Sequence, residues 1–171
     1  MSGRKSKNKG KSYERDVANF LTELYEESFT RVPYSGAFVG GQNIVRTETL
    51  SESQTRGFKG DIIPGPSFSK LVIEAKNYAE FSWANLALRK PNAQLDEWIG
   101  QAEESCEPGD KWLLIVKITR QGQFVLWDHQ NWRMPSLDIY GCNFYKHYNY
   151  MEFEEFWPPG CLRRHGASKT Q

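Results

Sequence analysis

The sequence is poor in cysteine and has no long apolar run, and both absences narrow the class of protein. Its three cysteines (Cys106, Cys142 and Cys161) form no Cys-x-x-Cys pair and have no suitably spaced histidines. A disulfide scaffold and a structural zinc site are therefore not expected. No stretch approaches the roughly 18 apolar residues of a membrane span, and the basic N-terminus lacks the apolar segment of a secretory signal. We expect a reduced, soluble, intracellular protein that contacts no membrane.

The composition is that of a folded domain. Of the 171 residues, 39% are hydrophobic and 14% aromatic, which is enough to bury the core of one ordinary domain with a modest appendage. Wholesale disorder is excluded because a disordered chain would carry far fewer apolar side chains.

Positive charge gathers at the start of the chain, although the net charge is only +1. Within residues 1–15 six cations stand against the single acid Glu14. Glycine and serine separate them, which predicts a flexible basic arm over residues 1–10. Such an arm can bind a polyanion such as DNA or RNA, or it can be a solvated tail without a function. The candidate DNA-binding cations here are Arg4, Lys5, Lys7, Lys9, Lys11 and Arg15.

The pattern of apolar residues predicts a mixed α/β domain over residues 11–128. An amphipathic helix is expected first, and a long polar, glycine-rich loop separates the first strand from the rest. A second helix precedes a final hairpin. The expected helices cover residues 11–27 and 92–105, and the expected strands cover residues 29–34, 58–63, 70–76, 111–118 and 123–128.

Residues 129–171 are expected to form a C-terminal extension. Residues 129–157 are dense in aromatic side chains but show weak periodicity. These side chains can pack on the core as an extra layer, pack against a partner subunit, or stack on unpaired bases. Packing is the simpler interpretation because aromatic side chains mostly bury themselves.

The residues that point to chemistry lie on two neighbouring predicted strands. Asp61 comes at the end of one strand, and Glu74 and Lys76 lie two residues apart on one face of the next. If the strands pair, Asp61 and Glu74 bring their carboxylates together, and such hard oxygen ligands suit Mg²⁺ or Mn²⁺. Lys76 beside them can orient or help deprotonate a water and offset charge on a phosphate. The alternative is a solvent-facing charge pair across two strands.

A third acid favours the chemical interpretation. Glu14 lies in the first turn of the predicted first helix, at the border of its apolar face, and from there it could reach a site at the sheet edge. Together these groups are the parts that metal-dependent phosphodiester hydrolysis requires.

These residues resemble the PD-(D/E)xK nuclease superfamily, and within it the Holliday junction resolvases of the archaeal and phage Hjc type. The similarity covers about residues 9–128 and implies a restriction-endonuclease-like core, in which a mixed central sheet is flanked by helices. The loop over residues 38–59 is longer than the resemblance implies, and residues after Asp128 have no counterpart in it. The matching segments are Lys9-Gly10, Glu14-Arg15, Arg31-Val32-Pro33-Tyr34-Ser35-Gly36, Asp61-Ile62 and Glu74-Ala75-Lys76.

The resemblance implies a role for each matched position. Metal-site acids would be Glu14, Asp61 and Glu74, and Lys76 would be the catalytic lysine. Ser35 would lie near the scissile phosphate, and Arg31 and Ser35 would join the basic arm in gripping DNA. A supporting glutamine would be Gln101, with Gln94 as the alternative, and Lys117 would match a lysine of the following strand. For Ser35, the glutamine and Lys117, a plain surface or supporting role is an equally open interpretation.

The leading hypothesis is therefore a Mg²⁺-dependent DNA endonuclease that resolves four-way (Holliday) junctions, with Mn²⁺ able to substitute. The resemblance also suggests a phage or archaeal source and action in the cytoplasm. A homodimer is expected because paired symmetric nicks need two sites related by a twofold axis. The alternatives are a nicking or restriction-like nuclease acting on duplex DNA, a non-catalytic DNA-binding protein, and a protein-interaction scaffold.

Overall fold

The computed structural model describes residues 2–33, 59–128 and 142–157. Its helices are α1 (Ser2–Tyr25), α4 (Trp83–Ala87), α5 (Ala93–Glu104) and α6 (Phe153–Phe156), with the 3-10 helix η2 at Pro66–Phe68. Its strands are β1 (Thr30–Arg31), β2 (Ile62–Ile63), β3 (Leu71–Tyr78), β4 (Lys111–Ile118), β5 (Gly122–Asp128), β6 (Asn143–Tyr145) and β7 (Tyr148–Glu152). No helix in the described ranges combines the length and the apolar character needed to cross a membrane.

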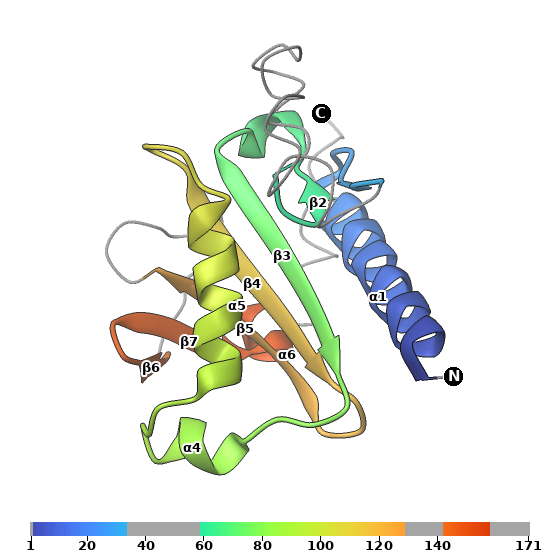
Figure 1. The fold of residues 1–171 in the computed structure, drawn as a ribbon. Helices are drawn as coiled ribbons and strands as arrows, with labels where there is room; N and C mark the ends of the chain where they lie inside the picture. Colours follow the sequence, from blue (N-terminus) through green and yellow to red (C-terminus); the bar gives the residue numbers. More distant parts are fainter. Residues whose placement is uncertain (1, 34–58, 129–141, 158–171) are drawn as a thin grey trace.

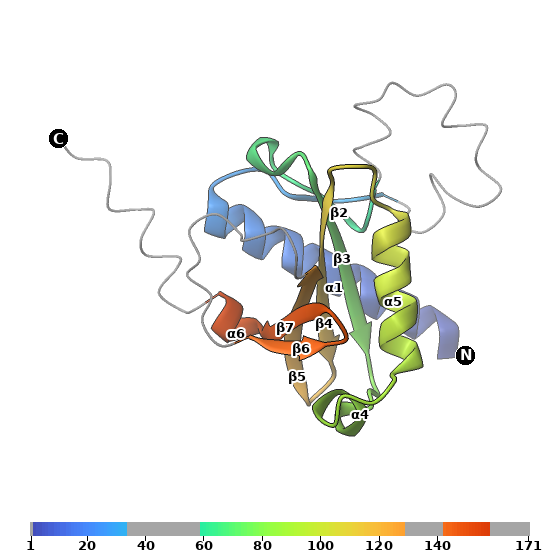
Figure 2. The ribbon, with the colours of Figure 1, turned by 90° about the vertical axis from the view of Figure 1, so that its left-hand side faces the viewer.

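All the strands belong to one mixed sheet in the order β1-β2-β3-β4-β5-β7-β6. Neighbouring strands are antiparallel except β3 and β4, which run parallel. The chain passes from β3 to β4 through α4 and α5, which supply the crossover that a parallel pair requires. Helix α1 lies against one face of the sheet, and α4 and α5 lie on the other (Figures 1 and 2). The predicted α/β class and mixed sheet are confirmed.

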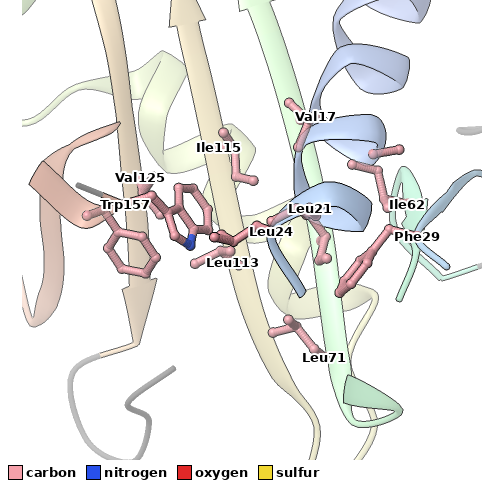
Figure 3. Packing of buried hydrophobic residues seen from close by; sticks show 14 of the residues in the cluster. Val17, Leu21, Leu24, Phe29, Ile62, Leu71, Leu113, Ile115, Val125 and Trp157 are labelled. Carbon is pink, nitrogen blue, oxygen red and sulfur yellow. The ribbon is translucent and has the colours of Figure 1, made fainter. Parts of the chain in front are cut away.

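Two buried clusters, one on each face, hold the layers together. Strand β3 shows how the sequence divides between them, since alternate residues point to opposite faces. Ile73 and Ala75 join the cluster beneath α1, whereas Val72 joins the cluster beneath α5. Figure 3 shows Val17, Leu21 and Leu24 of α1 packed towards the sheet in the first cluster. The apolar stripe predicted for the first helix is thus the face that α1 buries.

Helix α1 begins earlier than the sequence indicates. The flexible arm expected over residues 1–10 is wrong from Ser2 onward, because these residues form the first turns of α1. The side-chain amide of Asn77 donates to the carbonyl oxygen of Lys9 (3.4 Å), and Lys9 Nζ bonds Thr119 Oγ1. These contacts fix the helix to the ends of β3 and β4. They offset the cost of about 1 kcal/mol that a glycine such as Gly10 brings to a helix interior.

The two short strands beside β3 also differ from expectation. The strands predicted over residues 29–34 and 58–63 are two residues each, at Thr30–Arg31 and Ile62–Ile63. Pro33 has no N–H to donate and cannot extend a ladder, which limits β1. Gly60 has a φ of +68°, so the chain turns into β2 just before Asp61. The helix over residues 92–105 and the final hairpin match their predicted bounds within one residue.

The described part of the C-terminal extension completes the sheet. Strand β7 pairs with β5, and β6 pairs with β7, so residues 142–157 add two strands at the edge of the sheet and end in the short helix α6. Their aromatic side chains are buried on both faces: Phe156 and Trp157 pack in the α1 cluster, and Tyr145 and Tyr148 pack in the α5 cluster. Of the alternatives considered for the aromatic residues of the extension, these four pack on the core.

Tyr145→Phe is expected to destabilise the protein by about 1–3 kcal/mol. The Tyr145 hydroxyl accepts from the backbone N–H of Asn92 (2.8 Å) and donates to Asp96 Oδ1 (2.9 Å), so it ties β6 to the start of α5. Its loss leaves a buried N–H without an acceptor. Urea unfolding measures the change, with Phe144→Leu as the matched control. Phe144 is the neighbouring residue on β6 and is 39% exposed. An equal change in both variants would contradict the role of the hydroxyl.

Candidate active site

Asp61, directly before β2, lies opposite Glu74 of the adjacent antiparallel strand β3. Ile62 pairs with Ile73, and one step along each strand in opposite directions reaches Asp61 and Glu74. Asp61 Oδ2 also accepts a hydrogen bond from the backbone N–H of Ala75 (3.0 Å). This bond fixes the Asp61 carboxylate against β3 next to Glu74. The predicted pairing of the two strands, and the closeness of the two acids that it implied, are as the structure has them.

Lys76 completes a three-residue cluster. Its Nζ lies 2.7 Å from Glu74 Oε2, with which it forms a hydrogen bond, and 3.8 Å from Asp61 Oδ2. Glu74 and Lys76 share one face of β3 because they are two residues apart. That face is the one towards α5, opposite the face that packs against α1. We call Asp61, Glu74 and Lys76 the acid-lysine cluster.

A glycine allows the chain to approach β3 closely before Asp61. The backbone N–H of Asp61 donates to the carbonyl oxygen of Ile73 (2.8 Å). A Cβ atom at Gly60 would lie only 2.6 Å from that same oxygen, and the positive φ of Gly60 is one that other residues rarely adopt. The Gly-Asp-Ile sequence is therefore a local requirement of the fold as well as the source of the carboxylate.

The cluster is buried and carries more negative than positive charge. The side chains of Asp61, Glu74 and Lys76 are 13%, 8% and 15% exposed. Burial and the nearby Asp61 carboxylate raise the pKa of Glu74 to about 7, although Lys76 acts in the opposite direction. Burial would lower the pKa of Lys76, but Glu74 and Asp61 outweigh it, so the pKa of Lys76 is raised. Lys76 is therefore a cation at neutral pH, and it compensates only part of the negative charge that the two carboxyl groups can carry.

Glu14, the third acid predicted for the site, is bonded to an arginine. It projects from α1, where Glu14 Oε2 accepts from Arg31 Nε at 2.6 Å. Both residues lie on the α1 side of the sheet, because Arg31 pairs with Ile62, a member of the α1 cluster. One Nη atom of Arg31 is buried and has no hydrogen-bond partner among the described residues. The structure thus pairs the expected third acid with the expected DNA-binding arginine.

The remaining predicted residues that the structure describes have partners outside the acid-lysine cluster or are exposed. Gln101 is exposed on α5 and donates to Glu97 Oε1 (3.5 Å), and Gln94 is half-buried at the other end of that helix. Lys117 Nζ lies 5.4 Å from the centroid of the Tyr13 ring, on the α1 side. Ser35 and most of the long loop over residues 38–59 lie outside the described residues. So do the side chains of Arg4, Lys5 and Lys7, whereas Lys11 and Arg15 are exposed on α1.

Tyr78, which was not predicted from the sequence, also belongs to this face. Strand β3 runs to Tyr78, two residues beyond its predicted end, so Glu74, Lys76 and Tyr78 alternate along the same face. The sequence feature that could have predicted this is the alternation of side chains between the two faces of the strand, which continues through Asn77 and Tyr78.

The acid-lysine cluster fits a divalent cation that keeps part of its water shell. No group of three or more His, Cys, Asp or Glu side chains suited to a metal occurs in the described ranges. Mg²⁺, however, needs only one or two carboxylates when waters and substrate phosphates supply its other ligands. Two carboxylates so close that burial and mutual repulsion raise the pKa of Glu74 are a charge arrangement that a cation would relieve.

The mixed sheet flanked by helices and the Asp and Glu-x-Lys residues on adjacent strands define the nuclease class called PD-(D/E)xK. The model of a family described as "Phage putative PDDEXK endonuclease" matches residues 5–153, and the chain belongs to this family. It is thus an endonuclease of that type with a restriction-endonuclease-like core, and such nucleases act on DNA. No curated protein and no solved structure matches the chain. The family description names no junction specificity, so the Hjc-type resemblance stays a prediction.

Proposed function

We propose that this chain is a Mg²⁺-dependent endonuclease that hydrolyses phosphodiester bonds in branched DNA and resolves four-way junctions by paired nicks. The observation that carries the catalytic part is the acid-lysine cluster. It combines two adjacent buried carboxylates with a lysine ammonium 2.7 Å from Glu74 Oε2. Membership in a phage endonuclease family supports the reaction class and agrees with action in the host cytoplasm.

Asp61 and Glu74 would hold the metal ion, and Mn²⁺ would substitute for Mg²⁺ because both accept hard oxygen ligands. Bound there, the ion would supply a Lewis acid for a phosphate oxygen and lower the pKa of a water. Lys76 would donate a hydrogen bond to the attacking water or to a phosphate oxygen and offset the charge that develops on phosphorus. Its raised pKa favours these roles over that of a base.

The reaction is a hydrolysis. The water oxygen forms a bond to phosphorus, one P–O ester bond breaks, and the products are a phosphate monoester and a hydroxyl end. The Asp61 hydrogen bond to the Ala75 N–H (3.0 Å) would hold one carboxylate in position throughout. Because this bond comes from backbone that is itself part of the sheet, the site is preorganised on rigid elements.

The preference for four-way junctions rests on the motif Arg31-Val32-Pro33-Tyr34-Ser35-Gly36, which resembles that of junction resolvases. A homodimer would place two clusters on opposite strands, as symmetric resolution requires. The basic residues of α1 would contact phosphates, so binding should weaken steeply as salt is raised.

The test is cleavage of a synthetic four-way junction and of a linear duplex of matched sequence, each with Mg²⁺ or with EDTA. The wild-type protein is expected to make paired symmetric nicks in the junction alone, and EDTA and Glu74→Gln are expected to abolish them. Equal cutting of both substrates would support the nuclease activity but contradict the preference for junctions, and the protein would then be a nuclease that acts on duplex DNA. Binding without cutting, with Mn²⁺ as well, would mean a DNA-binding protein without catalysis.

A further inference from the structure

Tyr78 is an exposed aromatic residue on the same face of β3 as the acid-lysine cluster. Lys76 and Tyr78 are two residues apart, which on a strand is about 6.6 Å. Tyr78 is 43% exposed, although large apolar side chains in the described ranges are otherwise mostly buried. Single exposed apolar side chains are common, so it is the position of Tyr78 beside the candidate active site that makes its exposed ring a candidate contact for the substrate.

The Tyr78 ring is held in place from behind. Its centroid lies 4.7 Å from that of Trp98, which is 1% exposed, and Phe81 stacks on Trp98 with an interplanar angle of 16°. The Tyr78 carbonyl oxygen accepts from both the N–H (2.9 Å) and the hydroxyl (3.1 Å) of Thr119. The backbone and one side of the ring are thus fixed, so little conformational entropy would be lost if a ligand stacked on the ring.

A lysine lies on one side of Tyr78 and a turn with an arginine on the other. Lys76, which is paired with Glu74, precedes Tyr78 on the same face, and Tyr78, the last residue of β3, is joined to Thr119 in the β4–β5 turn. Arg120, the next residue of the turn, is exposed, whereas Lys9, which bonds the Thr119 hydroxyl, comes from α1 on the opposite face of the sheet. A phosphate chain that passes the acid-lysine cluster and Tyr78 would therefore reach the turn that carries Arg120. An aromatic platform between cations is the arrangement that binds single-stranded nucleic acid.

We propose that Tyr78 stacks on an unpaired base next to the phosphate that is cut, so that the preferred substrates have an unpaired base at the cleavage point. This inference rests on the proposed function and names its substrate class. In an intact duplex both faces of each base are already stacked on neighbouring bases, so a protein ring has no face to use. A base at a branch point or bulge offers one, and the separation of Lys76 from Tyr78 is about that of neighbouring nucleotides in an extended strand.

The test compares Tyr78→Leu with wild type on two DNA molecules of the same sequence, one fully paired and one with a single bulged base. Stacking on an aromatic side chain is worth about 1–3 kcal/mol per base, or roughly 5- to 150-fold in affinity. Tyr78→Leu is therefore expected to raise KM for the bulged substrate at least about fivefold and to leave that for the paired one unchanged. Tyr78→Phe keeps the ring and should restore the preference. Phe144→Leu, which removes an exposed aromatic side chain from β6, should leave KM unchanged for both substrates.

A second measurement separates stacking from catalysis. The bulged base is replaced by 2-aminopurine, whose fluorescence is quenched when it stacks, and DNA is bound to Glu74→Gln protein so that nothing is cut. Quenching in Glu74→Gln protein that is lost in the double variant Glu74→Gln/Tyr78→Leu supports the inference. This result would stand even if the wild-type protein cut neither DNA, so the inference can hold where the proposed function fails. Unchanged quenching, equal losses of cleavage on both substrates, or a change of oligomeric state in Tyr78→Leu would overturn it.

Discussion

Lys76→Met is expected to lower the rate of DNA cleavage by about 10²–10⁴-fold, the range seen when a group that moves protons or stabilises charge is removed from a transition state. Methionine keeps most of the length of the side chain and removes the ammonium that lies 2.7 Å from Glu74 Oε2. DNA affinity should change by less than about threefold, because many phosphate contacts contribute to it. Single-turnover cleavage of labelled DNA measures the rate, and fluorescence anisotropy measures the affinity.

Two other lysines serve as controls for Lys76→Met. Lys70 is exposed in the turn before β3, and Lys117 lies on the α1 side of the sheet beside Tyr13. Lys70→Met and Lys117→Met are each expected to cleave at nearly the wild-type rate. A loss in Lys117→Met as large as that in Lys76→Met would mean that the α1 side takes part in the reaction. Unimpaired cleavage by Lys76→Met would remove the lysine from the site.

The sequence was sufficient to predict the acid-lysine cluster because strand geometry is regular. Successive side chains of a strand point to opposite faces, so Glu74 and Lys76, two residues apart, share one face. The turn between the paired strands brings Asp61 opposite Glu74. The same regularity predicted α5 and the β4–β5 hairpin, whose apolar patterns are strong. These are local patterns that the tertiary structure leaves unchanged.

Other features depend on contacts between distant residues, which the sequence does not display. Glu14 lies on the side of α1 that meets Arg31, seventeen residues further on, and periodicity alone did not indicate which face of the sheet α1 would cover. The N-terminal part of α1 is attached to the sheet by contacts of Lys9 with Asn77 and Thr119. The weak periodicity of the extension concealed strands that are stable because β7 pairs with β5.

Glu74→Gln is expected to stabilise the metal-free protein by roughly 3 kcal/mol at pH 8 and to change its stability little at pH 4.5. The pKa of Glu74 is about 7 in the folded protein, against an ordinary value of 4.5. Between these values the unfolded chain has released its proton while the folded protein still holds it, so wild-type stability falls as pH rises through this window. The shift multiplied by about 1.4 kcal/mol per pKa unit gives the magnitude. Glutamine is uncharged throughout and can still accept the bond from Lys76.

Urea unfolding of both proteins in EDTA, from pH 4.5 to pH 8, measures this difference as a function of pH. Glu104→Gln, an exposed change on α5, is the control and should give a difference that is small at every pH. A stabilisation by Glu74→Gln that grows with pH, together with loss of cleavage, would show that Glu74 is retained at a cost to folding, which is typical of residues selected for chemistry. A glutamate kept only as a structural partner of Lys76 would give the opposite sign at pH 8, because its removal would destabilise the protein.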